Sequence, residues 1–94
     1  MRVRVQYNTP QVSVDEVFSG TSADEIVAAM QKAVASRLTF LMKPFVLGMS
    51  TTQFSQEVVR RYNEAAGRSV ASPQSAQEFL TLGRAEGIVT FLEM

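Results

Sequence analysis

The spacing of hydrophobic residues changes along the chain, and this change constrains the fold more than any other feature. Val3, Val5 and Tyr7 alternate with polar residues, as expected for a strand with one buried face. From Ile26 onward, apolar residues recur every third or fourth position, which is typical of an amphipathic helix. A chain of 94 residues with both patterns predicts a single domain, residues 1–94, that combines strands and helices.

A second strand is predicted after the turn at residues 8–10. Val12 and Val14 share one face, but the next two apolar residues are neighbours in the sequence, so the alternation breaks at Asp15-Glu16. We expect a β-bulge or the end of the strand at that point. A single capped helical turn is the alternative.

The third predicted strand is the β-branched and aromatic segment at residues 88–94. Three strands leave two sheet edges with unpaired backbone groups. Arg2 and Arg4 lie on the outer face of the first strand, which fits an edge protected by charge. The last strand is expected either to pair across a two-fold axis or to lie at the centre of the sheet.

Two helices are predicted in the middle of the chain. The first begins at the N-cap Ser22, and its apolar stripe runs to about Met42, before Pro44 ends it. The second begins near Ser50 and ends at Gly67, where a left-handed C-cap is expected. Both starts have the spacing of a capping box, with Glu or Gln three residues after the serine.

A third helix is predicted from Ser72-Pro73, an N-cap followed by a first-turn proline, to about Gly87. Gly83 lies on its apolar face, which indicates a neighbouring backbone too close for a Cβ atom. The element order is therefore β-β-α-α-α-β. The predicted fold class is α+β, with a three-stranded, mostly antiparallel sheet packed by three helices.

The composition excludes several kinds of chemistry. The chain has no Cys and no His, which excludes disulfide scaffolds, thiol nucleophiles, zinc fingers and histidine-based catalysis. No phosphate-binding, dinucleotide-binding or nucleophile-elbow motif is present. The acidic pairs Asp15-Glu16 and Asp24-Glu25 suit a solvated strand and a helix start better than a metal site or an acid–base pair. We therefore expect a non-enzymatic protein without a cofactor or metal.

The chain also lacks the signals of secretion or membrane insertion. The first residues alternate apolar and basic side chains, unlike a signal peptide. The most hydrophobic stretch is divided by Lys43-Pro44 and falls short of the ~18 residues of a membrane span. We expect a cytoplasmic protein with no membrane contact.

The apolar stretch at residues 38–49 is the main candidate for an interaction surface. Eight of its twelve residues are large and apolar, and they point in several directions around a helix end, so a single core-facing stripe does not absorb them all. The predicted contact residues are Phe40, Met42, Phe45, Val46, Leu47 and Met49. Self-association as a homodimer, or binding to another protein, through this stretch, a sheet edge or both, is the predicted function. The open alternatives are that the stretch closes one end of the core, or that it forms a pocket for an apolar small ligand.

A winged-helix-like C-terminal half that binds nucleic acid is the alternative fold and function. Its contacts would be Arg60, Arg61, Arg68 and Arg84. Two observations weigh against it. The balance of 9 Lys+Arg against 9 Asp+Glu leaves little charge to neutralise phosphates. Glutamates also lie at helical pairing distance from the first two arginines.

Overall fold

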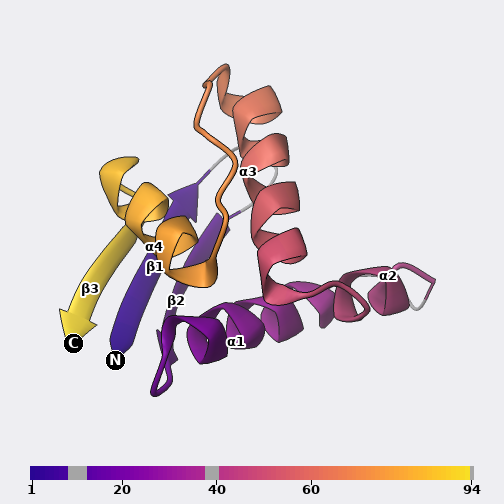
Figure 1. Ribbon diagram of the computed structural model, residues 1–94, viewed down its shortest axis with the longest axis horizontal. Coiled ribbons are helices and arrows are strands. Elements are labelled where there is room, and N and C mark those ends of the chain that lie inside the picture. Colours follow the sequence, from indigo (N-terminus) through magenta and orange to yellow (C-terminus); the bar gives the residue numbers. More distant parts are fainter. Residues whose placement is uncertain (9–12, 38–40, 94) are drawn as a thin grey trace.

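The computed structural model describes residues 1–8, 13–37 and 41–93 of the chain. In these residues, the α+β order is β-β-α-α-α-α-β (Figure 1). The elements are β1 (Arg2–Asn8), β2 (Ser13–Ser19), α1 (Ala23–Ala35), α2 (Lys43–Leu47), α3 (Thr51–Ala66), α4 (Ala76–Ala85) and β3 (Val89–Glu93). The three-stranded antiparallel sheet is confirmed, and the number of helices is four, where three were predicted.

The strand order is β2-β1-β3, with both pairings antiparallel. β1 is therefore the central strand, and the expectation that Arg2 and Arg4 protect an edge is wrong. β2 and β3 are the edge strands, because β1 pairs with β2 on one side and with β3 on the other. β3 lies at an edge, so the expectation that the last strand is central is wrong, and its pairing across a two-fold axis stays a prediction.

The predicted irregularity at Asp15-Glu16 is absent from the structure. β2 pairs with β1 in one continuous register from Ser19 to Ser13. Glu16 keeps the alternation because its side chain lies on the helix side of the sheet, where it pairs with Arg37 of the segment after α1. Val12, which the predicted strand included, lies outside the described residues.

α1 begins as predicted and ends earlier. The Ser22 hydroxyl accepts a hydrogen bond from the Glu25 backbone N–H (3.2 Å). The Glu25 carboxylate does not close a capping box with Ser22, because it accepts from the Thr21 N–H instead (3.1 Å). α1 stops at Ala35, and the next hydroxyl, that of Ser36, donates back to a carbonyl in the last turn.

Pro44 lies inside a helix, although the sequence predicts it only as the residue that ends one. It lies in the first turn of α2, where the N–H that proline lacks would have no helical partner. The single helix predicted to reach Met42 is thus replaced by α1 and a separate short helix. Residues 38–40 between them lie outside the described residues.

The ends of α3 match the prediction. Ser50 accepts from the Gln53 N–H (3.1 Å), and the Gln53 side chain accepts in return from the Ser50 N–H (3.0 Å), which completes the capping box. Gly67 closes the helix with φ 65°, in the left-handed region that glycine occupies without strain.

α4 starts three residues later than predicted. Its N-cap is Ser75, whose hydroxyl accepts from the Glu78 N–H (3.1 Å), rather than Ser72. Pro73 is fully buried ahead of the helix, and its carbonyl accepts a hydrogen bond from the Gln56 side chain of α3 (3.0 Å). This contact between elements fixes Pro73 outside the helix.

Gly83 marks a close contact, as predicted, but with a side chain and not a backbone. A Cβ atom placed on Gly83 would lie 2.6 Å from Cγ2 of Val89 in β3. The missing side chain therefore lets α4 pack directly on the strand that follows it.

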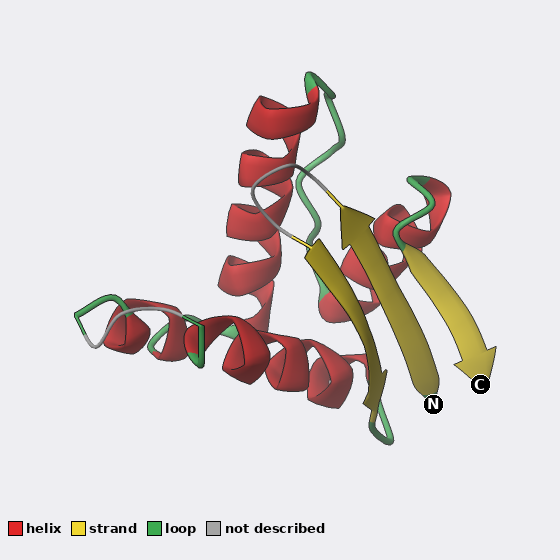
Figure 2. Cartoon of the chain, turned by 180° about the vertical axis from the view of Figure 1, so that it is seen from behind, coloured by secondary structure: helices red, strands yellow, loops and turns green. Residues whose placement is uncertain are grey.

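The helices lie on one side of the sheet (Figure 2). Side chains on that side form the core, and alternate residues of β1 on the other side are exposed. The core residues with the least exposure are Val3, Ile26, Val27 and Leu80. The opposite face of the sheet carries no helix and includes the exposed Val17 of β2.

Candidate interaction surface

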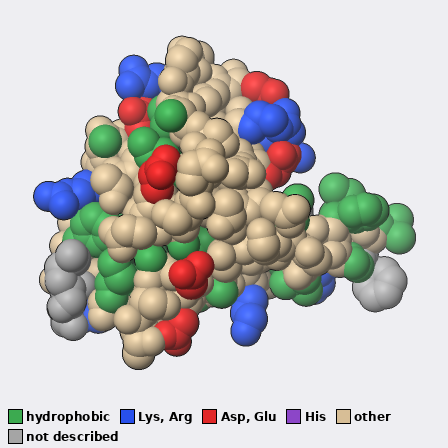
Figure 3. Space-filling view, in the orientation of Figure 1, with side chains coloured by type: hydrophobic (Ala, Val, Ile, Leu, Met, Phe, Trp, Pro, Cys, Tyr) green, Lys and Arg blue, Asp and Glu red, His purple; other side chains and the backbone are tan. Residues whose placement is uncertain are grey.

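The surface with the most exposed apolar side chains is the elbow, which we define as residues 41–49. It contains α2 and the two residues that lead into α3. Leu41 and Phe45 are 77% and 69% exposed, and Met42 and Leu47 are also exposed. Figure 3 shows these hydrophobic side chains gathered at the α2 end of the molecule. A contiguous exposed apolar group of this kind is typical of a binding surface.

The residues predicted from the sequence divide into three groups. Met42, Phe45 and Leu47 are exposed as expected. Val46 and Met49 are partly buried and pack against the core instead. Phe40 lies outside the described residues.

Leu41 is the exposed residue that the contact prediction missed. Its spacing continues the apolar stripe of the helix predicted to reach Met42, and it was not among the predicted contact residues. Because α1 ends at Ala35, that periodicity does not continue, and Leu41 lies outside the helix it was assigned to. The exposure of Leu41 follows from the end of α1 at Ala35. The sequence does not indicate that end, because apolar residues recur at helical spacing beyond it.

A buried glutamine holds the elbow in place. Gln31 of α1 is 6% exposed, and its Nε2 donates to the carbonyl of Val46 (2.6 Å) and to that of Met49 (2.9 Å). The elbow backbone is further closed by the Gly48 N–H, which donates to the Pro44 carbonyl (2.9 Å). The apolar side chains are therefore presented by a fixed backbone.

An apolar cavity of about 560 Å³ opens between the sheet and the helices. We call it the groove. Its walls come from β2, α1 and α3, and its inner end reaches β1, α4 and β3. Its apolar wall residues include Val14, Phe18, Met30, Val34, Val58 and Ala65. Several of these are only partly buried, so the groove extends the core to the surface.

The charged residues that line the groove each have a partner. Arg37 pairs with Glu16 across the mouth. Glu86 accepts from Arg68 (2.9 Å) and from the Tyr62 hydroxyl (2.8 Å), and these hydrogen bonds hold the pKa of Glu86 below its usual range. Arg61 pairs with a glutamate of its own helix (2.9 Å). The lining is therefore apolar with a neutralised rim.

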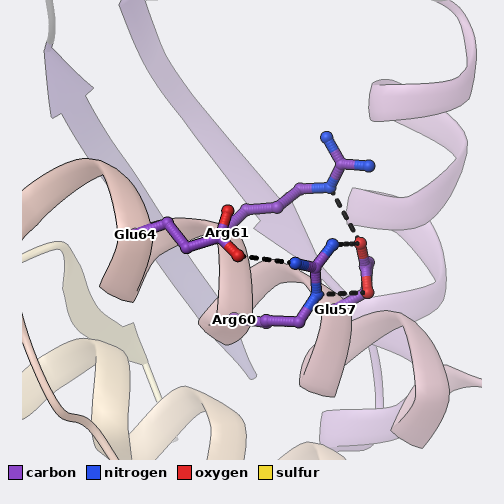
Figure 4. A network of polar contacts seen from close by, with 4 residues as sticks. All are labelled: Glu57, Arg60, Arg61 and Glu64. Atoms are coloured by element: carbon purple, nitrogen blue, oxygen red, sulfur yellow. Dashed lines mark hydrogen bonds and ion pairs between the residues drawn. The ribbon is translucent and has the colours of Figure 1, made fainter.

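Two of the arginines proposed for nucleic-acid contacts lie in a carboxylate network on α3 (Figure 4). Arg60 pairs with Glu57 and with Glu64 (2.7 Å), and Arg61 pairs with Glu57 (2.9 Å). The hydrogen bonds from Arg60 and Arg61 lower the pKa of Glu57 to about 2. These two cations are thus neutralised by neighbours on their own helix.

The other two arginines are also engaged. Arg68 pairs with Glu86 (2.9 Å), and the Arg84 guanidinium lies 5.5 Å from the centre of the Phe91 ring. A winged-helix C-terminal half would need its last strand as a wing, but β3 pairs with β1 from the other end of the chain. This arrangement does not join the four arginines into one basic patch.

The acidic pairs considered for catalysis or metal binding are dispersed. Asp15 forms a bidentate pair with Arg4 (2.9 Å), which lowers the pKa of Asp15. Asp24 accepts from the Thr51 hydroxyl at the start of α3 (3.0 Å). Among the described residues, no three metal-ligating side chains of the Asp, Glu, His or Cys type gather at one point.

The described helices are also too short or too polar to cross a bilayer. No family model matches the chain, and comparisons with curated proteins and with solved structures found no match.

Proposed function

We propose that this protein is a non-enzymatic interaction module that associates with a second copy of itself through the elbow. The observation that carries the proposal is the exposure of Leu41, Met42, Phe45 and Leu47 on a backbone that a buried glutamine fixes. Apolar side chains held out in this way gain free energy when a partner covers them, at about 25 cal/mol per Å² before association costs are subtracted.

The charge pattern of the elbow supports association through apolar contacts. Lys43 is the only charged residue among residues 41–49. Interface centres are depleted in charged residues and enriched in aromatic residues and methionine, and the elbow contributes Phe45 and Met42 of those types. No large desolvation cost for buried charges therefore opposes the contact.

The non-enzymatic part of the proposal rests on how the reactive side chains are used. The sequence offers neither His nor Cys. Asp24 and Glu25 serve the starts of α1 and α3, and Asp15 and Glu57 are held by arginines. A carboxylate with a lowered pKa is a poor proton acceptor at neutral pH, which disfavours general-base catalysis by Glu57.

The test compares two charge insertions at exposed positions. Phe45→Asp places a carboxylate in the elbow, and the matched control Val17→Asp places one on the uncovered face of the sheet. Light scattering during gel filtration measures the mass of each variant. We expect Phe45→Asp to be a monomer and Val17→Asp to remain a dimer. Equal masses for the two variants would contradict the assignment of the elbow.

A further inference from the structure

The groove is an open, mostly apolar cavity of about 560 Å³. Its walls include Val14, Phe18, Met30 and Val58, whose side chains are only partly buried in the isolated chain. Water against these walls is displaced favourably by any apolar group that fits.

The rim of the groove favours an uncharged occupant. Glu16 and Arg37 neutralise each other, as do Glu86 and Arg68, and Arg61 is held by a glutamate of α3. The charges at the rim are balanced by their partners, so the rim has no net charge that would favour a charged group of either sign. Apolar side chains of a protein segment need no charged partner there.

The same chain carries an apolar projection with nothing to cover it. The elbow lies at the far end of α1, and α3 stands between the elbow and the sheet (Figures 1 and 2). The hydrogen bonds from Gln31 fix the elbow in this position. The elbow of one copy is therefore not placed to fill its own groove, but it is available to the groove of another copy.

α1 joins the two surfaces. Its residues Met30 and Val34 line the groove, and the chain leads from the end of α1 into the elbow. Val34 is 40% exposed, so the apolar lining of the groove reaches the surface of α1 near its C-terminal end. A two-fold axis near Val34 would set each elbow against the opposite groove. In such an isologous contact, the elbow and the groove of both copies are buried, and the assembly ends at the dimer.

We infer that the elbow inserts Phe45 and its apolar neighbours into the α1–α3–β2 groove of a second copy, in a reciprocal dimer. This inference rests on the proposed function and adds the receiving site. Apolar burial supplies the association, and the neutral rim adds no charge repulsion. The interface then completes a core that each chain leaves open.

Engineered thiols test the contact directly, because the native chain has no cysteine. Phe45→Cys protein is mixed with Val58→Cys or Ala65→Cys protein, both of which carry the thiol in the groove, and is oxidised with copper phenanthroline. Val17→Cys on the uncovered sheet face is the matched control. Differently tagged copies distinguish mixed disulfides from homodimers on a non-reducing gel.

We expect Phe45→Cys to join one of the two groove positions about tenfold faster than it joins Val17→Cys, because docking raises the local thiol concentration. A dimeric wild type whose Phe45→Cys variant joins all three positions at equal rates would overturn the groove assignment and leave self-association intact. A monomeric wild type would overturn both proposals.

A fluorescent apolar dye gives a second readout that needs no crosslink. Anilinonaphthalene sulfonate binds exposed hydrophobic surface. If the elbow fills the groove, the monomeric Phe45→Asp variant binds more dye per chain than the wild-type dimer, even though it has lost one apolar side chain. If the wild-type dimer binds as much dye per chain as the Phe45→Asp variant, its grooves are vacant, as expected for a small-ligand pocket. That result would overturn the inference.

Discussion

The side-chain amide of Gln31, buried in α1, donates a hydrogen bond of 2.6 Å to the backbone carbonyl of Val46 in α2. This contact joins residues fifteen positions apart and sets where the chain turns after α1. A second bond goes to the carbonyl of Met49. The side chains of Val46 and Met49 are partly buried against the core, whereas Phe45 is exposed.

Replacing Gln31 by Leu should destabilise the protein by about 1–3 kcal/mol, since the Met49 carbonyl loses the Gln31 donor and the Val46 carbonyl keeps only the Met49 N–H (3.2 Å). The control is Gln77→Leu, at an exposed position in α4, which should change the free energy of unfolding by less than about 0.5 kcal/mol. Urea unfolding followed by circular dichroism measures both. Similar stabilities for the two variants would show that the Gln31 hydrogen bonds contribute little.

Gly83→Ala should destabilise the protein, although alanine is the better helix former by about 1 kcal/mol. The added Cβ would lie 2.6 Å from Cγ2 of Val89, a stiff β-branched side chain. We expect a net loss of about 1–3 kcal/mol from overpacking. In a Val89→Ala background the same glycine substitution should cost much less. A double-mutant cycle measures the difference, and additive effects would contradict the contact.

Two nearby serines distinguish the observed start of α4 from the start expected from the sequence. Ser75→Ala should cost about 1 kcal/mol, because Ser75 accepts from the Glu78 N–H. Ser72→Ala should change stability by less than about 0.5 kcal/mol. Thermal unfolding of the two variants side by side gives the comparison. A larger loss for Ser72→Ala would move the helix start back to Pro73.

The Glu57 network should make part of the stability depend on pH. Arg60 and Arg61 depress the folded-state pKa of Glu57 to about 2, below the ordinary value of 4.5. The stabilisation is therefore complete above about pH 4.5 and is lost as the pH falls toward 2. Because the pairs are exposed, we expect less than about 1 kcal/mol, reduced by salt.

The measurement compares wild type with Glu57→Gln by urea unfolding at neutral pH and at stepwise lower pH. The wild type should be the more stable protein at neutral pH, and the difference should shrink as the pH falls. The matched background carries Arg60→Gln and Arg61→Gln, in which the Glu57 substitution should have no pH-dependent effect. A difference that persists in that background would show that Glu57 acts through other groups.

Local chemistry made much of the fold predictable. The N-caps Ser22 and Ser50 and the left-handed Gly67 depend on residues within a few positions in the sequence, and all three were predicted. The start of α4 was not, because a distant hydrogen bond from Gln56 to the Pro73 carbonyl competes with the local signal. Glu16 was misread for the same reason, since its partner Arg37 lies twenty-one residues away.

The interaction surface was predictable in place but not in detail. The density of apolar residues located it, and Met42, Phe45 and Leu47 are exposed. The sequence did not distinguish them from Val46 and Met49, because those two side chains pack against core residues that lie far away in the chain. The groove has no sequence signal, since its walls come from elements far apart in the chain.

Sedimentation equilibrium of the wild-type chain tests self-association most directly. A chain of 10.4 kDa should sediment at twice that mass at micromolar concentration and dissociate on dilution. A mass of 10.4 kDa that stays constant across the whole concentration range would contradict the account, because the elbow would then remain uncovered in solution.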